Sequence, residues 1–450
     1  MVPPRPSQGN DPLLHFEAVA AGGSGAAAQA DALVAGALRA LLAHDVAAWP
    51  AHGLALVKQR TVRGVFAGAL GGVPVHVKVF RPDTFGDQVR DLLRRARGGV
   101  EATNLQRARA LGLPVVEPLA HGFASDGGRK RSFVVTRTAA GAPFTWQLAA
   151  GTRRAVGALL RRIDDLGVRL GDLHPGNLLV GTDGDLHLLD LTAMAAVGEV
   201  DLRTRARALA FFCHELDGGA RDPLAAPLLA GYQQAGALPA SFADELVLAT
   251  RRWRADALPA FGRRASRTCK HTEVPKRARA QPRWHWHLPG DDAGRRARCE
   301  QFAAAPPPPD KSGRRGAVWL LPAFAVKDRE AGKARKLWRA SYWLLFARVP
   351  APTPIALRLH QGRGYVFVQN LGHPSLAQEL AAGALTAATL PAVARRIGDS
   401  VGRLHAHGLR NRDLKLDNLV RDPRTGDVAM VDLDGVRRCA ADETRGRGAD

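Results

Sequence analysis

The chain has 450 residues, enough for two or three domains, because a single core seldom exceeds about 250–300 residues. Its formal net charge of +22 favours anionic partners, although an Arg-rich solvated surface would give the same total. The sequence contains no apolar run of about 18 residues, no signal-peptide pattern, and no metal-ligand or disulfide spacing among its four cysteines. We therefore expect a cytoplasmic protein, soluble or peripheral at the inner membrane, and exclude a membrane-spanning or disulfide-stapled one.

The first half of the chain predicts helices and strands behind a leader. Residues 1–30 are rich in Pro, Gly, Ala and Ser, which predicts a disordered leader. The glycine-rich stretch 68–72 predicts the turn of a β-hairpin, and Gly98-Gly99 predicts a break between two helices. In chain order, the predicted elements are a helix over 31–47, strands over 54–67 and 73–80, two helices flanking Gly98-Gly99, a strand over 133–138, and helices over 153–166 and 201–258.

Residues 263–315 differ from their surroundings because they are basic, poor in aliphatic residues and interrupted by prolines. They are interpreted either as a linker or as degraded first strands of a second domain. The Trp/His cluster over 283–287 favours local packing over a platform for stacking bases or sugars. The predicted organisation is a leader over 1–30, a first domain over 31–262, this segment, and a second domain over 316–450.

An ordered series of motifs occurs twice. The segments LPVVEPLA (113–120) and VPAPTPIA (349–356) share Pro at their second and sixth positions. An Asp lies 54 residues after the second of these prolines in the first copy and 59 residues after it in the second. Each Asp is followed at +5 by an Asn, and then by a hydrophobic strand that ends in another Asp. The series predicts an internal repeat; its members are Asp172, Asn177 and Asp190 in the first copy, and Asp413, Asn418 and Asp432 in the second.

This order of residues suits phosphoryl transfer from ATP, which needs positioning and charge neutralisation more than covalent catalysis. In the first copy, Asp172 is suited to accept the proton of an attacking hydroxyl. Asn177 and Asp190 supply the hard oxygen ligands that Mg²⁺ prefers. Lys78 on a strand, with Glu101 on a helix 23 residues later, is suited to hold the phosphates of the nucleotide.

The phosphate-covering loop is the weakest part of the pattern. Taken singly, the lysine and the glutamate would be ordinary surface residues, and only their order and spacing favour a catalytic role. Glycines 64, 68, 71 and 72 lie near the expected place, but the sequence has no G-x-G-x-x-G there.

Together these motifs resemble the bacterial lipopolysaccharide kinase (Kdo/WaaP) family, relatives of protein kinases and aminoglycoside phosphotransferases. The resemblance covers about 50–260 and 315–440. It is carried by VKVF (77–80), GLPVVEPLA (112–120), GDLHPGNLLV (171–180) with LLDL (188–191), and RDLKLDNLV (412–420) with MVDLDGV (430–436). It implies an α+β fold of two tandem protein-kinase-like domains, each with a small antiparallel-sheet N-lobe, a helix in that lobe and a helical C-lobe. It also implies ATP and Mg²⁺ in the cleft and a sugar hydroxyl of the lipopolysaccharide inner core as acceptor.

The second copy departs from the pattern. Lys327 is its best strand lysine, and Lys415, two residues after Asp413, is suited to neutralise a transferring phosphate. No acidic residue occurs from 331 to 371, so the orienting glutamate has no candidate. Only 18 residues follow Asp432, which predicts a reduced C-lobe.

The sequence therefore predicts an ATP- and Mg²⁺-dependent phosphotransferase whose acceptor is an anionic sugar or glycolipid, with peripheral contact to an acidic membrane face. The first copy is expected to carry catalysis. Three alternatives stay open: a tandem pseudokinase or scaffold that binds nucleotide without transfer, a second active site in the second copy, and a protein Ser/Thr kinase. Nucleic acid is not an expected partner, because few aromatic residues accompany the basic runs.

Overall fold

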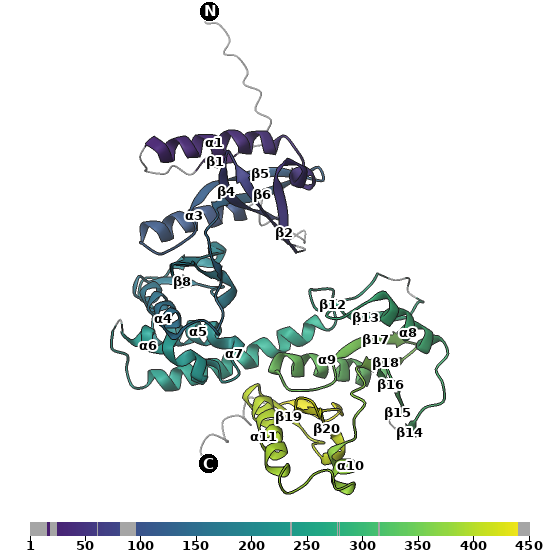
Figure 1. Cartoon of the computed structure of the whole chain (residues 1–450). Coiled ribbons are helices and arrows are strands. Elements are labelled where there is room, and N and C mark those ends of the chain that lie inside the picture. The colour runs from purple at the N-terminus through teal and green to yellow at the C-terminus, as the bar shows by residue number, and fades with distance from the viewer. Residues whose placement is uncertain are drawn as a thin grey trace, which may run out of the picture. The chain divides into compact units, whose positions relative to one another are not determined.

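In the computed structural model, the described residues are 16–18, 25–60, 62–81, 96–234, 236–276, 278, 280–313 and 316–439. The chain divides into two compact units, Met1–Leu246 (unit 1) and Val247–Asp450 (unit 2) (Figure 1). Each unit combines antiparallel sheet with helices, which confirms the predicted mixture of helix and strand. In the described part of the chain, no helix is both long enough and apolar enough to cross a bilayer.

Unit 1 begins with a six-stranded antiparallel sheet in the order β1-β5-β6-β4-β3-β2. Alternation along the central strand β4 places Val75, Val77 and Val79 on one face, in a core with α1. Lys78 lies on the other face of the sheet, where it reaches Glu101 of α3. Helix α3 covers this face (Figure 1). The strands and helices are β1 (Phe16–Ala18), α1 (Gly25–Leu42), β2 (Leu54–Arg60), β3 (Arg63–Leu70), β4 (Val73–Phe80), α3 (Arg97–Ala110), β5 (Pro118–Asp126) and β6 (Arg129–Arg137).

Two local predictions for this region were wrong, and a third was displaced by two residues. The single strand expected over 54–67 is two strands, β2 and β3, which form an additional hairpin. The break predicted at Gly98-Gly99 lies just before these residues, at the non-helical Ala96, and both glycines are in the first turn of α3, where a Cβ on Gly98 would meet the Phe133 carbonyl oxygen at 2.2 Å. Its lack of a side chain therefore lets α3 approach β6. Residues 16–18, expected in the leader, form an edge strand on β5. The helix expected before Gly98 falls largely outside the described residues.

The second part of unit 1 is mainly helical. A short loop between β8 and β9 carries the Asp-x4-Asn motif, and β10 leads to Asp190. The elements are β7 (Ala142–Pro143), α4 (Ala150–Asp165), β8 (Val168–Leu170), β9 (Leu178–Val180), β10 (Leu186–Leu188), β11 (Met194–Ala196), α5 (Leu202–Phe212), α6 (Ala226–Gln234) and α7 (Phe242–Arg264), the last of which continues into unit 2.

Helices α4 and α6 cross at paired glycines. A Cβ on Gly157 would lie 1.8 Å from the carbonyl oxygen of Leu228, and one on Gly231 would lie 1.9 Å from that of Arg154. The helix backbones therefore touch, and Asp164 of α4 accepts a 2.5 Å hydrogen bond from the hydroxyl of Tyr232 beside the crossing. This crossing fixes the helix that leads into the loop of Asp172.

Unit 2 contains a seven-stranded antiparallel sheet in the order β12-β13-β17-β18-β16-β15-β14. Helix α9 packs on one face through Leu337 and Trp338, and α8 packs on the other through Cys299 and Phe302. The elements are β12 (Thr272–Glu273), β13 (Arg283–His287), α8 (Ala293–Ala304), β14 (Lys311–Gly313), β15 (Gly316–Leu320), β16 (Ala325–Glu330), α9 (Ala331–Ala347), β17 (Pro354–His360) and β18 (Arg363–Val368).

The segment 263–315 contributes β12, β13, β14 and α8 to this layer, with β13 paired to β17. Its Trp/His cluster packs locally, as expected. Trp286 is buried against α8, and its ring stacks on that of Trp284 with centroids 4.5 Å apart. His285 and His287 are also buried. These side chains belong to the core of unit 2 rather than to a stacking surface.

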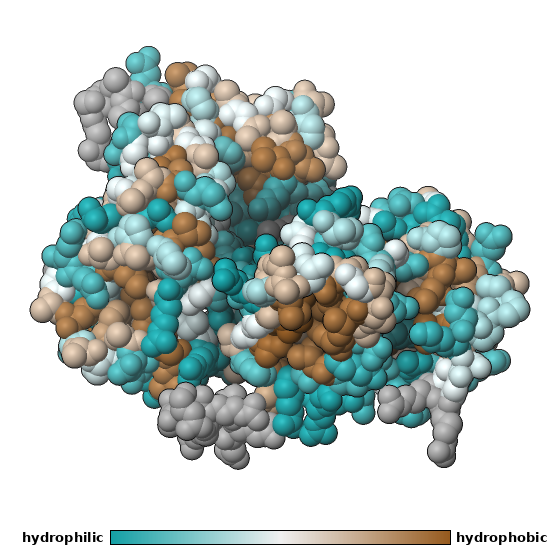
Figure 2. Space-filling model, turned by 60° about the horizontal axis from the view of Figure 1, so that its bottom comes forward, coloured by the Kyte–Doolittle hydropathy of each residue, from teal (hydrophilic) through white to brown (hydrophobic). Residues whose placement is uncertain are grey.

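The remainder of unit 2 is short. It comprises α10 (Leu376–Ala381), α11 (Leu390–Ala406), β19 (Leu409–Asn411), β20 (Leu419–Arg421), β21 (Val428–Met430) and β22 (Val436–Arg438). Helix α11 is amphipathic and buries Val393 and Leu404. On the face drawn in Figure 2, apolar residues form several separate areas with hydrophilic residues between them.

Candidate active site

Lys78 and Glu101 form the centre of a buried polar cluster in unit 1. The Lys78 Nζ donates to both carboxylate oxygens of Glu101, at 2.7 and 3.0 Å, and lies 3.3 Å from Oδ1 of Asp190. The Glu101 side chain is 3% exposed and the Lys78 side chain 15%, so their charges are poorly screened. Strand β4, helix α3 and the segment after β10 thus bring together three of the predicted site residues.

The loop after β8 holds two more. Asp172 is exposed, and its main-chain carbonyl accepts a 2.9 Å hydrogen bond from Nδ2 of the buried Asn177. His174 caps the short 3-10 turn at Pro175–Asn177 by accepting the Gly176 N–H at 3.1 Å. With its Nδ2 committed to the loop, the side-chain oxygen of Asn177 is the group left to serve as a ligand.

Asp190 is positioned by backbone contacts on both sides. The Leu189 N–H donates to the Asn177 carbonyl at 2.9 Å, which ties the segment to the loop. On the far side, Asn104 of α3 donates to the Leu191 carbonyl at 2.7 Å. Asp190 itself adopts the left-handed backbone conformation, with φ of 59°. Residues other than glycine seldom adopt this conformation, and those that do are concentrated at functional sites.

Arg63 is a member of the cluster that the sequence did not reveal. It opens β3, and its Nη1 donates to Oδ2 of Asp190. Because 54–67 was expected to be one strand, the hairpin tip between Arg60 and Arg63 went unrecognised. Gly71 and Gly72 instead make the β3–β4 turn, and Gly68 lies within β3, so of the four candidate glycines only Gly64 adjoins this tip.

Charge and burial act differently on the two carboxylates. Burial raises the pKa of Glu101 against the opposing charge of Lys78. Burial alone would also raise the pKa of Asp190, but the charges of Lys78 and Arg63 and the hydrogen bonds from Arg63 and Thr192 hold it below its ordinary value. Asp190 is therefore kept in the ionised form that a metal ligand requires.

The residues present suit Mg²⁺, which takes few ligands from the protein, better than a metal whose ligands all come from the protein. One carboxylate, that of Asp190, and one carboxamide, that of Asn177, are joined through the Leu189 backbone bond. No group of three or more His, Cys, Asp or Glu with metal-site geometry occurs in the described part of the chain. Mg²⁺ usually takes one or two carboxylates and completes its shell with water and substrate phosphates.

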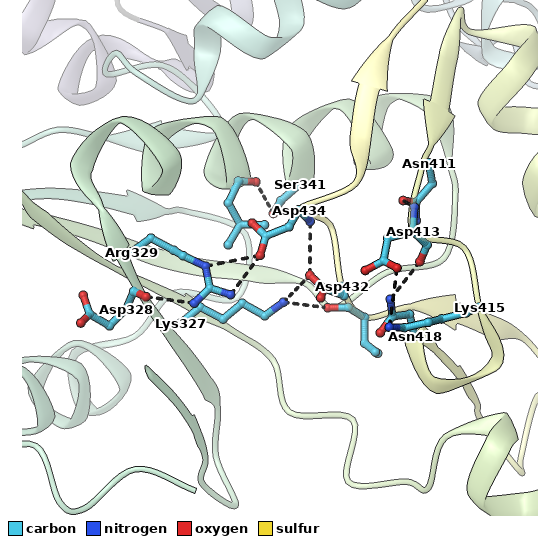
Figure 3. A network of polar contacts seen from close by, with 12 residues as sticks. Lys327, Asp328, Arg329, Ser341, Asn411, Asp413, Lys415, Asn418, Asp432 and Asp434 are labelled. Atoms are coloured by element: carbon cyan, nitrogen blue, oxygen red, sulfur yellow. Dashed lines mark hydrogen bonds and ion pairs between the residues drawn. The ribbon is translucent and has the colours of Figure 1, made fainter. Parts of the chain in front are cut away.

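Unit 2 contains a second cluster with different pairing (Figure 3). Lys327 and Arg329 extend side by side from β16, Lys327 toward Asp432 and Arg329 toward Asp434 (Figure 3). The Lys327 Nζ lies 2.9 Å from Asp432 Oδ1, and the Arg329 Nη2 lies 2.9 Å from Asp434 Oδ2. The charge of Lys327 holds the pKa of Asp432 below its ordinary value, although burial acts the other way. Two cations thus meet two carboxylates.

In the second copy, the described partners of Lys327 do not include a helix glutamate, since no acidic residue occurs from 331 to 371. The other hydrogen bond of Lys327 goes to the Val431 carbonyl, at 3.5 Å. Leu337, which occupies the position expected for the glutamate, is buried in the apolar core. The loop of Asp413 keeps its form: Asn418 donates to the Asp413 carbonyl at 2.9 Å, and Lys415 lies 3.6 Å from the Asp413 carboxylate.

Several backbone connections recur in the two units at matching motif positions. The Leu188 N–H donates to the Pro114 carbonyl at 2.8 Å, and that of Met430 donates to the Pro350 carbonyl at 2.9 Å. The Val431 N–H donates to the Asn418 carbonyl at 3.0 Å, as Leu189 does to Asn177 in unit 1. In both units these bonds link the segment that ends in Asp to the start of the proline motif and to the Asn of the loop.

One comparison with known proteins bears directly on this geometry. Residues 71–196 match the model of the lipopolysaccharide kinase (Kdo/WaaP) family. The match contains Lys78, Glu101, Asp172, Asn177 and Asp190, and it confirms the resemblance for this segment, which is less than a third of the chain. The family is one of phosphotransferases, and the cluster in unit 1 lies within the matched residues. Unit 2 lies outside them.

Other comparisons are weaker. WbdD, also described as a bifunctional kinase-methyltransferase, is 18% identical over 43% of this chain and 49% of its own, with a TM-score of 0.29. This chain thus spans about half the length of WbdD. An aminoglycoside-3'-phosphotransferase of type VIII is 19% identical over 48% of this chain and 97% of its own, with a TM-score of 0.32. TM-scores of this size do not establish a shared fold. No curated protein matches the sequence.

Proposed function

We propose that unit 1 transfers the γ-phosphoryl group of Mg·ATP to a hydroxyl group of a sugar or glycolipid. The observation that carries the proposal is the half-buried Lys78, which bridges Glu101 at 2.7 Å and Asp190 at 3.3 Å. A lysine oriented by a helix glutamate beside a metal-binding aspartate is the arrangement that phosphoryl transfer from ATP requires. The family match over the same residues supports it.

The proposed roles follow from position. Lys78, oriented by Glu101, binds the α- and β-phosphates, and Asn177 and Asp190 hold Mg²⁺. Asp172 accepts the proton of the acceptor hydroxyl while the oxygen of that hydroxyl attacks the γ-phosphorus. A new oxygen–phosphorus bond forms, the bond to the β,γ-bridging oxygen breaks, and ADP leaves with that electron pair. The exposure of Asp172 suits a residue that must reach an incoming acceptor.

The acceptor class is proposed from the family description and from charge. The matched family acts on lipopolysaccharide by its name, and the chain carries a formal net charge of +22. Positive charge favours anionic inner-core sugars and an acidic membrane face, where such a lipid would be presented. We therefore propose a glycolipid hydroxyl as acceptor, with peripheral contact at the inner membrane.

We further propose that unit 2 is a second, reduced kinase-like domain that does not transfer phosphate. The recurring backbone bonds, the lysine on β16 and the matching loop support a tandem arrangement. Lys327 has no helix glutamate and is paired with Asp432 itself, so the cation and the metal ligand neutralise one another. The Asp413–Lys415 pair favours a protein Ser/Thr kinase as the second candidate for this unit.

The proposal is tested by transfer from labelled ATP. The acceptors are a lipid A–inner-core glycolipid, a generic protein substrate and buffer alone, with wild type, Asp190→Asn and Asp432→Asn as enzymes. We expect labelled glycolipid with wild type and Asp432→Asn, and a loss of about 10³-fold or more with Asp190→Asn. Undiminished transfer by Asp190→Asn would overturn the assignment to unit 1. Label in protein that disappears with Asp432→Asn would favour the second candidate.

A further inference from the structure

Arg63 lies on the same face of the sheet as Lys78. In the β3–β4 pairing, Val65 is opposite Lys78 and Arg63 is opposite Phe80. Directly opposed residues project to one face, and residues two apart along a strand do the same. Arg63 also follows the tip of the β2–β3 hairpin, so the hairpin that precedes the lysine strand delivers a cation to the nucleotide site.

In the structure, Arg63 is hydrogen-bonded to the carboxylate of Asp190, the residue that is proposed to bind the metal. It donates to Oδ2 of Asp190, while Thr192 donates to Oδ1 at 3.1 Å and Lys78 lies 3.3 Å from the same oxygen. Both oxygens of Asp190 are therefore engaged. A guanidinium and a divalent cation repel one another, so Asp190 can bind Mg²⁺ only if Arg63 gives up its contact.

The phosphates of the nucleotide are suitable partners for the Arg63 side chain once it has left Asp190. A guanidinium pairs with phosphate in two parallel hydrogen bonds, and Arg63 starts from the oxygen beside which metal-bound phosphates would lie. We propose that Arg63 is a phosphate-binding residue of the nucleotide site. It replaces the backbone of the missing glycine-rich loop and exchanges Asp190 for the β- and γ-phosphates when Mg·ATP binds. The proposal rests on the proposed function of unit 1.

The described residues of unit 2 do not repeat this arrangement. Val318 pairs with Lys327 as Val65 does with Lys78, which puts Gly316 in the place of Arg63. Among the described residues, Arg329 of β16 contributes an arginine to this cluster; its side chain is 7% exposed and is bonded to Asp434 and to the Asp328 carbonyl. The Arg63 side chain is 23% exposed on a hairpin strand. Arg63 is thus able to exchange partners, whereas Arg329 is fixed in the interior.

The test measures binding rather than turnover. Mg²⁺ alone, adenosine, AMP and the non-hydrolysable Mg·AMP-PNP are titrated by calorimetry into wild type, Arg63→Met, Arg63→Lys and the control Arg107→Met. Arg107 is an exposed arginine on α3, outside the cluster. For Arg63→Met we expect about 10- to 100-fold weaker Mg·AMP-PNP binding, unchanged adenosine and AMP binding, and tighter binding of Mg²⁺ alone. Arg63→Lys should fall between wild type and Arg63→Met.

The outcomes separate the two claims. If wild type binds no nucleotide, the proposed function of unit 1 fails. If wild type binds Mg·AMP-PNP and Arg63→Met binds it equally well, only the inference about Arg63 fails. Equal weakening of adenosine and Mg·AMP-PNP in Arg63→Met and Arg63→Lys would show a structural role and would also overturn the inference.

Discussion

The two polar clusters contain the same kind of strand lysine but give it different partners. In unit 1, Lys78 donates to the buried Glu101 of α3 at 2.7 Å and stays 3.3 Å from Asp190. In unit 2, Lys327 lies 2.9 Å from Asp432, and α9 offers the apolar Leu337 where the glutamate is expected. The lysine in unit 1 is thus held by a residue with no proposed role in metal binding.

In the proposed function, this difference separates a site whose aspartate can exchange its protein cations for a metal from a site whose aspartates stay paired. When a helix glutamate holds the lysine, the aspartate can release its protein cations to bind metal without leaving the lysine unpaired. In unit 2, each of Asp432 and Asp434 has its own cation, so metal binding would leave Lys327 and Arg329 uncompensated beside it. The comparison predicts that matched substitutions in the two units have unequal effects.

Matched replacement of the strand lysines gives the largest expected difference. Lys78→Met should lower kcat/KM for phosphate transfer by about 10²–10³-fold, because it removes the charge that is proposed to hold the α- and β-phosphates of the nucleotide. Lys327→Met should change kcat/KM by less than about twofold. Steady-state transfer from labelled ATP to the glycolipid measures both.

Lys78→Met leaves Glu101 buried without its cation, so folding needs a separate control. The double variant Lys78→Met/Glu101→Gln removes both charges, and should restore thermal stability without restoring transfer. Equal losses of activity in the Lys78 and Lys327 variants would contradict the asymmetry and show that both clusters contribute to turnover.

Much of the unit 1 cluster could be predicted from the sequence, because its members lie in local patterns. Lys78 sits in an alternating strand, and Asp172 and Asn177 share one short loop. The contact of Lys78 with Glu101 required only a helix between two strands of the sheet, and the structure places the two residues in contact. The Asp190 position followed from a short hydrophobic strand that ends in Asp.

The missed features depend on contacts that no local pattern records. Arg63 was missed because the sequence between Arg60 and Arg63 contains no Gly or Pro that would indicate a turn. The Arg329–Asp434 pair joins residues 105 positions apart. The break expected at Gly98-Gly99 lies at Ala96, and Gly98 is within the first turn of α3, where β6 packs against the helix backbone. In each case tertiary packing, and not propensity, decided the outcome.

A second matched pair concerns the helix that leads into each loop. Gly157 of α4 lies 15 residues before Asp172, and Gly398 of α11 lies 15 residues before Asp413. A Cβ on Gly157 would meet the Leu228 carbonyl oxygen at 1.8 Å, whereas one on Gly398 would meet no atom within 4 Å. Gly157→Ala should therefore destabilise unit 1 by about 3 kcal/mol, since the clash is with backbone. Gly398→Ala should stabilise unit 2 by about 1 kcal/mol through helix propensity.

Urea dependence of hydrogen exchange, followed separately in peptides of α4 and α11, measures the free energy of unfolding of each unit. Gly151 is the control within unit 1, because it also lies in α4 and a Cβ added there would meet no atom within 4 Å. Gly151→Ala should therefore not destabilise unit 1. Destabilisation by Gly398→Ala would mean that a helix covers α11 in solution, as α6 covers α4.

A further expected effect depends on pH and concerns two histidines in the core of unit 2. Burial lowers the pKa of His285 to about 4, with the charge of Arg283 adding to it, and both ring nitrogens of His285 are buried. Burial likewise lowers the pKa of His287 to about 4, and its Nδ1 lies 3.0 Å from the Tyr342 hydroxyl. Both rings are therefore neutral in the folded unit at pH 7.

Because both pKa values are lowered, the unfolded state binds more protons than the folded state between about pH 6.5 and pH 4. The stabilisation from the neutral rings is complete above that window and is lost as the pH falls through it. Each histidine contributes a slope of about 1.4 kcal/mol per pH unit to the free energy of unfolding. His285→Phe fills a similar volume without a titrating group, so it should reduce the acid sensitivity of unit 2 by about half.

Hydrogen exchange in peptides of β13 and β17 at pH 7, 6 and 5 measures this slope, with His405→Asn, at an exposed position on α11, as control. An unchanged slope in His285→Phe would show that His285 is already protonated or solvated in the folded unit, and that the core of unit 2 is more open than the buried Trp/His cluster indicates.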